Sequence, residues 1–243
     1  MKHLDVSAVD YLRRLTDVAG IGGLTAAALV SMVEYLDALI ETNTRINLTR
    51  IVEPEVAVRL HLADSLLALP AVAGAPDGAL LDIGTGGGIP GVPLCIATGR
   101  RGVLLDSVAK KATAVAGILE TVDPAGQITV VAARAEDYAR EAASSFAVVT
   151  ARAVSELPAI VELAAPFLMM GGRLVALKGA PELSELERGA AAATICGLTE
   201  IEICHLTVPE GTERRTIVVY EKYAQPTEKL PRRVGLAQKS PLA

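Results

Sequence analysis

The fold of this chain is decided by the stretch Asp82-Ile83-Gly84-Thr85-Gly86-Gly87-Gly88-Ile89-Pro90-Gly91. It reads D-x-G-x-G-x-G, follows the apolar run 79–81, and precedes a second apolar run, 102–105, that ends in Asp106. A strand, a glycine turn, a helix and a second strand ending in an acid are how an α/β protein holds an adenosine-containing cofactor. Glycines permit positive φ and a close approach of backbone N–H groups, and Asp106 is placed to accept hydrogen bonds from ribose hydroxyls.

The identity of the cofactor depends on the acid at the start of this stretch. The spacing of Gly86, Gly88 and Gly91 also satisfies the dinucleotide fingerprint G-x-G-x-x-G. Dinucleotide-binding strands usually end in apolar residues, however, and a pyrophosphate prefers a positive surround at a helix N-terminus, so Asp82 disfavours a nicotinamide cofactor. S-adenosylmethionine has no phosphate and carries a cationic amine and a sulfonium. We therefore expect S-adenosylmethionine, with a nicotinamide or a purely structural glycine turn as the alternatives.

Length and composition fit one α/β domain with a small helical extension. The chain has 243 residues, of which 51% are hydrophobic, enough to bury a full core. We expect no membrane span, because no apolar run approaches about 20 residues, and no secretion signal, because residues 1–5 lack a hydrophobic region. The three cysteines show no metal-ligand spacing. The sequence therefore predicts a cytoplasmic, metal-free protein with reduced thiols, and we expect a monomer.

The charge of the chain is uneven. A net charge of −5 argues against unspecific nucleic-acid binding. The last residues, 226–243, form a basic tail whose cations are Lys229, Arg232, Arg233 and Lys239. Two interpretations stay open: the tail contacts phosphates, or it is a solubilising and partly disordered end, which is what charge alone favours.

Apolar periodicity divides the rest of the chain into two parts. Helices are expected over 6–18, after Thr25 and from Pro54, and they form an N-terminal extension over 1–74. Within a core over 75–225, strands are expected at 79–83, 102–106, 127–132, 146–151 and 173–178. Helices are expected there at 90–98, 108–121, 155–168 and 181–193. Extended runs follow at 198–207 and 215–223. This order predicts a Rossmann-like, doubly wound, mostly parallel sheet with an antiparallel edge.

Polar residues gather at the expected carboxyl ends of the strands, where open α/β sheets bind their ligands. We expect these residues to converge on one cleft: Asp82, Asp106, Arg134, Ala135, Glu136, Arg152 and Lys178. Glu136 is placed near an adenine ring, and Arg152 and Lys178 would line the side that receives the acceptor. The alternative for Arg152 is a structural salt bridge.

Several short motifs occur in a fixed order along most of the chain. They are RINLT at 45–49, RLHLADSL at 59–66, the loop 82–93, LLDS at 104–107 with Lys110, ARA at 151–153, ALKG at 176–179, and PRRxGxxxKxPL at 231–242. Each is weak alone, but in this order they resemble the RsmG family. These are the bacterial small-subunit ribosomal RNA guanine-N7 methyltransferases, also called glucose-inhibited division protein B. One departure lies at 110–115, where the family's usual Arg and Phe are missing, which affects the helix there rather than the cofactor site.

The resemblance implies a function and two sets of site residues. The implied reaction is methyl transfer from S-adenosylmethionine to N7 of a guanosine in 16S ribosomal RNA within the 30S particle. The implied contacts to the methyl donor are Gly84, Ile89, Ala135, Glu136 and Arg152. The positions associated with substrate binding or activity are Asn47, His61, Lys178 and Arg214. Two residues have simpler alternatives: Asn47 as the residue that shapes its own turn, and His61 as a hydrogen-bond partner of Asp64 on one helix face.

The chemistry of the implied acceptor sets what the enzyme must do. Guanine N7 has an in-plane lone pair and no proton to lose, so no general base is expected, and the main tasks are alignment and proximity. Arg152 and Lys178 would hold O6, a phosphate or the cofactor, and the target base must be exposed or flipped. Two alternatives stay open. One is a methyltransferase with a small-molecule acceptor, and the other is a nicotinamide oxidoreductase or a non-catalytic nucleotide-binding module.

Overall fold

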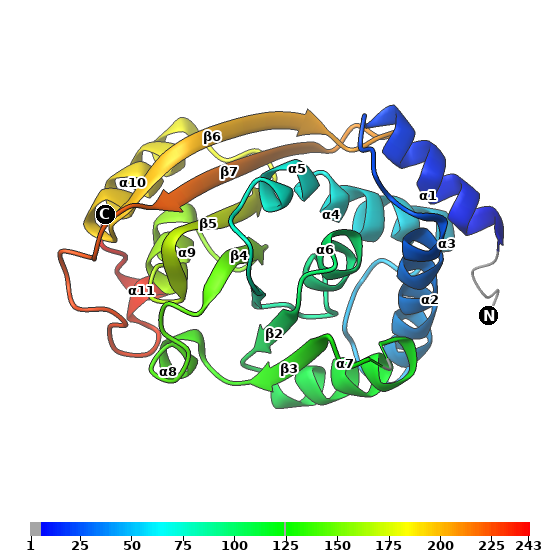
Figure 1. Cartoon of the computed structure of the whole chain (residues 1–243), viewed down its shortest axis with the longest axis horizontal. Helices are drawn as coiled ribbons and strands as arrows, with labels where there is room; N and C mark the ends of the chain where they lie inside the picture. Colours follow the sequence, from blue (N-terminus) through cyan, green and yellow to red (C-terminus); the bar gives the residue numbers. More distant parts are fainter. Residues whose placement is uncertain (1–5, 124) are drawn as a thin grey trace.

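A computed structural model describes residues 6–123 and 125–243; residues 1–5, on which the expectation of no secretion signal rests, lie outside it. Within the described residues, seven strands form one sheet in the order β3-β2-β1-β4-β5-β7-β6 (Figure 1). The strands are β1 (Leu80–Ile83), β2 (Gly102–Asp106), β3 (Ile128–Ala132), β4 (Phe146–Arg152), β5 (Leu168–Lys178), β6 (Leu198–Thr207) and β7 (Arg214–Lys222).

Helices cover both faces of this sheet. Before the sheet come α1 (Val6–Val18), α2 (Ala26–Asn43), α3 (Pro54–Ala57), η1 (Val58–Ala63), α4 (Asp64–Leu66) and α5 (Leu69–Ala73). Between and after the strands come α6 (Gly91–Thr98), α7 (Ala109–Val122), α8 (Ala135–Tyr138), α9 (Leu157–Ala164), α10 (Leu183–Ile195) and α11 (Leu236–Lys239).

The pairing of the strands confirms the predicted doubly wound fold. β1 to β5 are parallel, and β7 pairs antiparallel with both β5 and β6. The chain reverses its direction of winding between β1 and β4, which is where ligands bind in such sheets. One boundary was wrong: the helix expected over 155–168 ends at Ala164, because Pro166 cannot continue a helix. Strand β5 therefore begins at Leu168, earlier than the expected 173.

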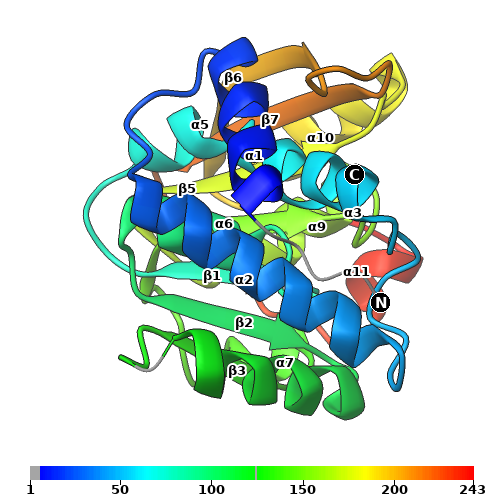
Figure 2. The same cartoon turned by 90° about the vertical axis from the view of Figure 1, so that its right-hand side faces the viewer.

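Two apolar clusters lie on the two faces of the sheet. Successive strand residues alternate between them, so that Leu80 packs in one cluster and Leu81 in the other. The first cluster includes the predicted stripe of α2, with Met32, Leu36 and Leu39 fully buried. Figure 2 shows α1 and α2 in front of the sheet. The N-terminal helices therefore share a core with β1, β2, α6 and α7.

The sequence predicted no segment long and apolar enough to span a membrane, but one helical stretch meets that criterion. Pro54–Ala73 is long and apolar enough to cross a bilayer by length and composition alone, and it is the one such stretch in the described part of the chain. Interruptions such as Arg59 and His61 hid this in the sequence. The stretch is 72% buried within the fold, and Leu62 and Leu66 are fully buried in the first apolar cluster. It is therefore packed as a core helix.

Candidate functional site

The glycine loop after β1 has a backbone that only glycine supports. Gly84, Gly86 and Gly88 have φ angles of 67°, 56° and 77°, as the sequence predicted from their spacing. A Cβ built on Gly88 would lie 2.0 Å from the Tyr35 hydroxyl oxygen. That hydroxyl donates a hydrogen bond to the Gly87 carbonyl at 2.9 Å, so α2 supports the loop from below.

Asp82 lies beneath the loop. Its side chain is fully buried, Oδ2 accepts a hydrogen bond from the Gly91 amide at 3.1 Å, and Oδ1 accepts one from the Thr150 hydroxyl at 2.8 Å. Burial raises the pKa of the Asp82 carboxyl to about 6. The sequence analysis expected this acid near the positive charge of a cofactor; its hydrogen bonds tie β1 to the first residue of α6 and to β4.

Asp106 holds the other side of the loop. Its Oδ2 accepts a hydrogen bond from the Gly86 amide at 2.9 Å, and its Oδ1 accepts one from the Val108 amide at 2.8 Å. Unlike Asp82, it lines a cavity of about 240 Å³ at the carboxyl ends of β1, β2 and β3, which we call the loop cavity. The residues that line it are Ile83, Gly84, Leu105, Asp106, Ser107, Ala133, Arg134, Ala135, Glu136, Val154, Leu163 and Gln238.

The loop cavity brings together four of the predicted cofactor residues, namely Gly84, Asp106, Ala135 and Glu136. Ile89 is buried within the loop and is not among the lining residues. The chemistry of the cavity fits an adenosine, because the nearly buried carboxylates of Asp106 and Glu136 can accept hydrogen bonds from ribose hydroxyls and an adenine amine. Its width depends on glycine, since a Cβ on Gly84 would lie 2.8 Å from the Val154 side chain across the cavity.

A second cavity, of about 390 Å³, lies at the ends of β4, β5 and β7, and we call it the cationic cavity. The residues that line it are Ile51, Leu60, His61, Asp64, Arg152, Ala153, Leu177, Lys178, Gly179 and Arg215. The predicted residues Arg152, Lys178 and His61 are therefore brought together here. The sequence analysis missed Arg215.

Asp64 organises the guanidinium groups of this cavity. Its carboxylate is 3% exposed and accepts a hydrogen bond from Arg152 Nη1 at 3.2 Å and from Arg215 Nε at 2.8 Å. Arg152 Nη1 also donates to the Leu60 carbonyl at 3.1 Å. Burial lowers the pKa of Arg152, and the Asp64 charge opposes that shift. One buried anion thus holds two cations side by side, so the salt bridge expected as an alternative for Arg152 is present within the cavity.

Lys178 has partners from two other elements. Its Nζ donates to the Ser155 carbonyl at 2.7 Å and lies 2.8 Å from Glu185 Oε1, which comes from α10. The same carboxylate oxygen accepts a hydrogen bond from the Leu157 amide at 2.9 Å. Lys178 is therefore fixed at the end of β5 and joins α10 to the turn that follows β4.

His61 is buried at the edge of the cationic cavity and is neutral at pH 7. Burial, and then the nearby Arg152 charge, lower its pKa to about 4. Its Nε2 lies 2.9 Å from the Thr49 hydroxyl and 3.3 Å from the Ile51 carbonyl, while Nδ1 has no partner among the described residues. The hydrogen bond to Asp64 that the sequence offered as an alternative is not formed, because Asp64 pairs with the two arginines.

Asn47 and Arg214, two of the four residues associated with substrate binding or activity, lie outside both cavities. Asn47 is exposed, and the turn around it is held by Asn43, whose side-chain oxygen accepts hydrogen bonds from the Leu48 and Thr49 amides at 2.7 and 2.8 Å. Arg214 is also exposed, and its carbonyl accepts a hydrogen bond from Arg215 Nη1 at 2.9 Å. Side chains alternate along β7, and of these two neighbours Arg215 lines the cationic cavity.

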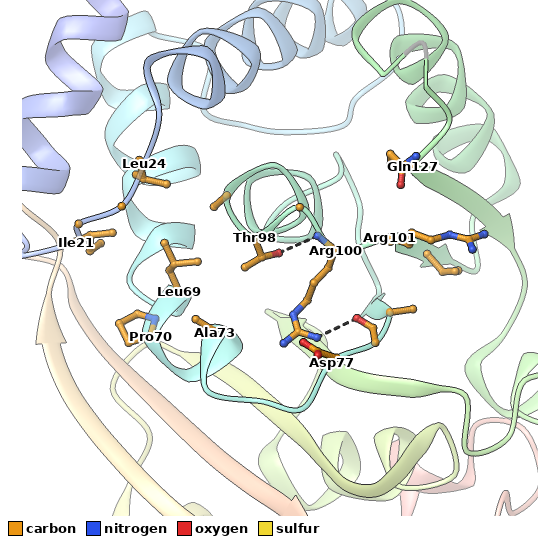
Figure 3. Close-up of a pocket in the computed structure, with 18 of the residues that line it drawn as sticks. Ile21, Leu24, Leu69, Pro70, Ala73, Asp77, Thr98, Arg100, Arg101 and Gln127 are labelled. Carbon is orange, nitrogen blue, oxygen red and sulfur yellow. Dashed lines mark hydrogen bonds between the residues drawn. The ribbon is translucent and has the colours of Figure 1, made fainter.

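A larger cavity than these two, of about 980 Å³, lies at the opposite, amino end of the sheet (Figure 3). Its lining includes Gly102 and Val103, which begin β2. The Arg100 side chain there donates to the carbonyls of Val72, Ala75, Pro76 and Gly78 at 2.7–3.3 Å. These bonds occupy the guanidinium with backbone, and open α/β sheets bind ligands at their carboxyl ends. We therefore place the functional site in the loop and cationic cavities.

The described residues show the state of the cysteine thiols and whether side chains gather as metal ligands. Cys95 and Cys196 are buried free thiols, and Cys204 is a half-buried one. Burial raises the pKa of the Cys196 thiol to about 12, which disfavours the nucleophilic thiolate. Among residues 6–123 and 125–243, no group of three or more His, Cys, Asp or Glu side chains could hold a metal ion.

Known proteins resemble this chain over most of its length. The family model GidB, described as rRNA small subunit methyltransferase G, matches residues 28–217. A protein of Desulfitobacterium hafniense named ribosomal RNA small subunit methyltransferase G is 39% identical over 214 residues, which cover 86% of this chain and 87% of the relative. A protein of the same name from Rubrobacter xylanophilus is 34% identical over 246 residues, with 99% and 93% coverage.

Solved structures show the same fold at low sequence identity. The O-methyltransferase from Bacillus cereus, solved in complex with SAH, has a TM-score of 0.57 at 17% identity and covers 89% of this chain and 99% of that one. A geranyl diphosphate methyltransferase in complex with GPP and sinefungin has a TM-score of 0.58 at 14% identity, with 87% and 99% coverage. These likenesses establish a Rossmann-like methyltransferase fold.

Proposed function

Because the chain belongs to the GidB family, rRNA small subunit methyltransferase G, we propose that it transfers a methyl group from S-adenosylmethionine to N7 of a guanosine in 16S ribosomal RNA. The loop cavity would hold the cofactor and the cationic cavity would receive the target nucleotide. We further propose that the substrate is the folded 30S particle and that the enzyme acts in the cytoplasm as a monomer. A chain with a net charge of −5 gains little from unspecific attraction to RNA and benefits from recognising a shape.

One observation carries this proposal: a single turn joins the two cavities. Arg152 and Ala153 line the cationic cavity, and the next residue, Val154, lines the loop cavity. Ala153 has a φ of 57°, a conformation that a non-glycine residue adopts only when its surroundings enforce it. Groups bound in the two cavities would therefore face each other across the end of β4, which is the arrangement that methyl transfer requires.

The reaction asks for alignment more than for proton transfer. Bound S-adenosylmethionine supplies a methyl group on a positively charged sulfur. The N7 lone pair of guanine forms the new bond to carbon while the carbon–sulfur bond breaks and its electron pair stays on sulfur. The positive charge thus moves from sulfur to the base, and no proton is lost. The pKa of His61, lowered by burial to about 4, makes it a weak base, which agrees with a reaction that needs no general base.

The cations of the second cavity would hold the nucleotide and not the reacting atom. A donor placed on N7 would occupy the lone pair that must attack. We assign Arg152, Arg215 and Lys178 to guanine O6 and to the phosphates beside the target base. Their side chains are 20%, 23% and 15% exposed, so they can contact a substrate while their carboxylate partners keep them in place.

The N-terminal helices are part of this site. They supply His61, with its unpartnered Nδ1, and Asp64, the shared partner of the two arginines. In this proposal Asp64 is a positioning residue, and His61 forms part of the wall of the cationic cavity beside the target base. The division into an extension over 1–74 and a methyltransferase core over 75–225 therefore describes the order of the chain, and the function uses both.

The test is transfer of labelled methyl from S-adenosylmethionine to small ribosomal subunits that lack their native methylation. Deproteinised 16S RNA and a reaction without RNA are run in parallel. We expect label to be recovered as 7-methylguanosine, with more label in the particle than in naked RNA. Label in no RNA, with cofactor binding retained, would contradict the RNA acceptor and direct the search to small molecules.

The cofactor is tested separately by thermal stabilisation. A ligand that binds only the native state raises the melting temperature. We expect S-adenosylhomocysteine to raise it and NAD to leave it unchanged. Stabilisation by NAD alone would instead favour an oxidoreductase.

A further inference from the structure

The end of the chain packs against the core beside the loop cavity. Residues 230–243, which we call the C-terminal strap, include α11, drawn in red beside α8 and α9 in Figure 1. Ala237 is 1% exposed within the second apolar cluster, and Leu230, Leu242 and Ala243 pack against the same cluster. The strap is therefore an ordered part of the fold and differs from the partly disordered end that charge alone favoured.

Arg232 anchors the strap to α9. Its Nε donates to Glu162 Oε1 at 2.6 Å, and its Nη2 bonds both Glu162 Oε2 and, at 2.7 Å, the Ser240 carbonyl within the strap. The Glu162 side chain is 3% exposed. A bidentate pair with a nearly buried carboxylate is among the stronger polar contacts in proteins. Arg232 therefore fixes the strap on the helix that also supplies Leu163 to the loop cavity.

The strap also contacts a residue assigned to the cofactor. The Gly235 amide donates a hydrogen bond to Glu136 Oε1 at 2.7 Å. Glu136 is 5% exposed and lines the loop cavity, so this bond fixes how its carboxylate is oriented there. Three residues further on, Gln238 lies on the rim of the same cavity. Gly235 and Gln238 of the strap thus lie at one wall of the cavity. The bonds of Arg232 to Glu162 and to the Ser240 carbonyl fix the segment that contains both.

We infer that the C-terminal strap is a component of the cofactor site, with Gln238 as a contact to the adenosine end and Arg232 as a positioning residue. An adenine ring offers an exocyclic amine and ring nitrogens. Glu136 Oε2 can accept from the amine while Oε1 is held by Gly235, and the Gln238 amide can donate to a ring nitrogen or a ribose oxygen. This inference rests on the proposed function, since it concerns the same cofactor.

The charges of the strap support this assignment over a role in RNA binding alone. Of its cations, Arg232 is committed to Glu162 and is not available to a phosphate. Arg233 and Lys239 are exposed. Arg233 is next in sequence to Arg232, carries the same charge and has no carboxylate partner among the described residues, so it serves as a matched control.

The closing experiment measures S-adenosylhomocysteine binding to the full-length protein by calorimetry. We expect Arg232→Gln to weaken the affinity about tenfold and Gln238→Ala about threefold to fivefold, because each removes one placed hydrogen-bonding group. Arg233→Gln is expected to match the wild type within about twofold, since its side chain is exposed. The double variant Glu162→Gln with Arg232→Gln removes both charges of the pair, so a loss of affinity there cannot come from an unpaired buried charge.

Hydrogen exchange at the Gly235 amide gives a second readout that does not depend on activity. Saturating S-adenosylhomocysteine is expected to slow this exchange in the wild type and in Arg233→Gln, and much less in Arg232→Gln. If the wild type binds and Arg232→Gln and Gln238→Ala both match Arg233→Gln in affinity and exchange, the strap inference is wrong and the proposed function is kept. If the wild type does not bind S-adenosylhomocysteine, both are wrong.

Discussion

The loop cavity and the cationic cavity adjoin each other but are built in opposite ways. In the loop cavity, Asp106 and Glu136 accept hydrogen bonds from the backbone amides of Gly86 and Gly235. In the cationic cavity, arginine and lysine side chains are held by carboxylates such as Asp64. In the cationic cavity Arg152, Lys178 and Arg215 outnumber the one acid, Asp64, which suits an RNA, whereas the loop cavity places Asp106 and Glu136 as acceptors beside Arg134. The difference also shows that the loop cavity depends on backbone shape, whereas the cationic cavity depends on side-chain charge.

The largest expected effect comes from removing the anion of the cationic cavity. Asp64→Ala removes the carboxylate that the Arg152 and Arg215 guanidinium groups share and leaves each with only a backbone carbonyl as its partner among the described residues. Breaking a buried charged contact in this way costs about 3–5 kcal/mol, so the free energy of unfolding should fall by that order. Urea denaturation measures it. Asp64→Asn, which keeps the shape and loses the charge, should fall between this variant and the wild type.

A small loss for Asp64→Ala would mean that the two arginines find water or other partners. A decrease below about 1 kcal/mol, the value typical of an exposed ion pair, would contradict the organising role of Asp64. The two cavities would then differ only in which residues line them, and not in how those residues are held in place.

The corresponding change on the cofactor side of the site is a change of backbone in the glycine loop after β1. Gly88→Ala forces a positive φ on a residue with a side chain and places its Cβ against Tyr35. We expect about 1–3 kcal/mol of strain and a loss of S-adenosylhomocysteine affinity measured by calorimetry. The double variant Gly88→Ala with Tyr35→Phe removes the hydroxyl that clashes and should recover part of the affinity. No difference between Gly88→Ala and the wild type would show that the loop tolerates other conformations.

A pair of neighbouring arginines tests the cationic cavity through charge. Arg215→Gln should lower methyl transfer to the particle by about ten- to a hundredfold, the range for a charge-assisted contact, and leave cofactor affinity unchanged. Arg214→Gln should match the wild type within about twofold, because its side chain is exposed outside the cavity. Kinetics with a saturating cofactor measure both. Equal losses in the two variants would contradict the assignment of Arg215 and favour a diffuse basic surface.

The features of the loop cavity could be predicted because they are local in the sequence. The glycine spacing predicted the positive φ angles, and the strand-end rule placed Asp106 and Glu136 together. The bond from Gly86 to Asp106 spans 20 residues, within one strand–helix–strand unit. Short-range patterns of this kind can be recognised without a structure.

The features of the cationic cavity depend on contacts that no local pattern encodes. Asp64 meets Arg152 across 88 residues and Arg215 across 151 residues. The choice between Arg214 and Arg215 depends on the register of β7, which alternates the two sides of the strand. The position of Gln238 likewise depends on how the end of the chain packs. The roles proposed for Asp64, Arg215 and Gln238 could therefore not be predicted without the three-dimensional structure.

The smallest effect we predict is a change in the pH dependence of stability, caused by two buried titrating groups, His61 and Asp82. The pKa of His61 is lowered to about 4, so the stability it contributes is complete above its unfolded pKa, near 6.5, and is lost as the pH falls toward 4. The pKa of Asp82 is raised to about 6 from 3.8, so its contribution is complete below 3.8 and is lost as the pH rises through 6. Between pH 7 and pH 5 the two contributions have opposite signs.

These opposite slopes should largely cancel in the wild type and appear in the single variants. On going from pH 7 to pH 5, His61→Gln should become more stable and Asp82→Asn less stable, each relative to the wild-type change and by about 1–2 kcal/mol. Denaturation at a series of pH values measures both. If the two variants keep the wild-type pH dependence, neither group titrates as its burial requires. A change in only one of them would identify which of the two groups is kept away from water in the fold, because the pKa shifts of His61 and Asp82 both come first from burial.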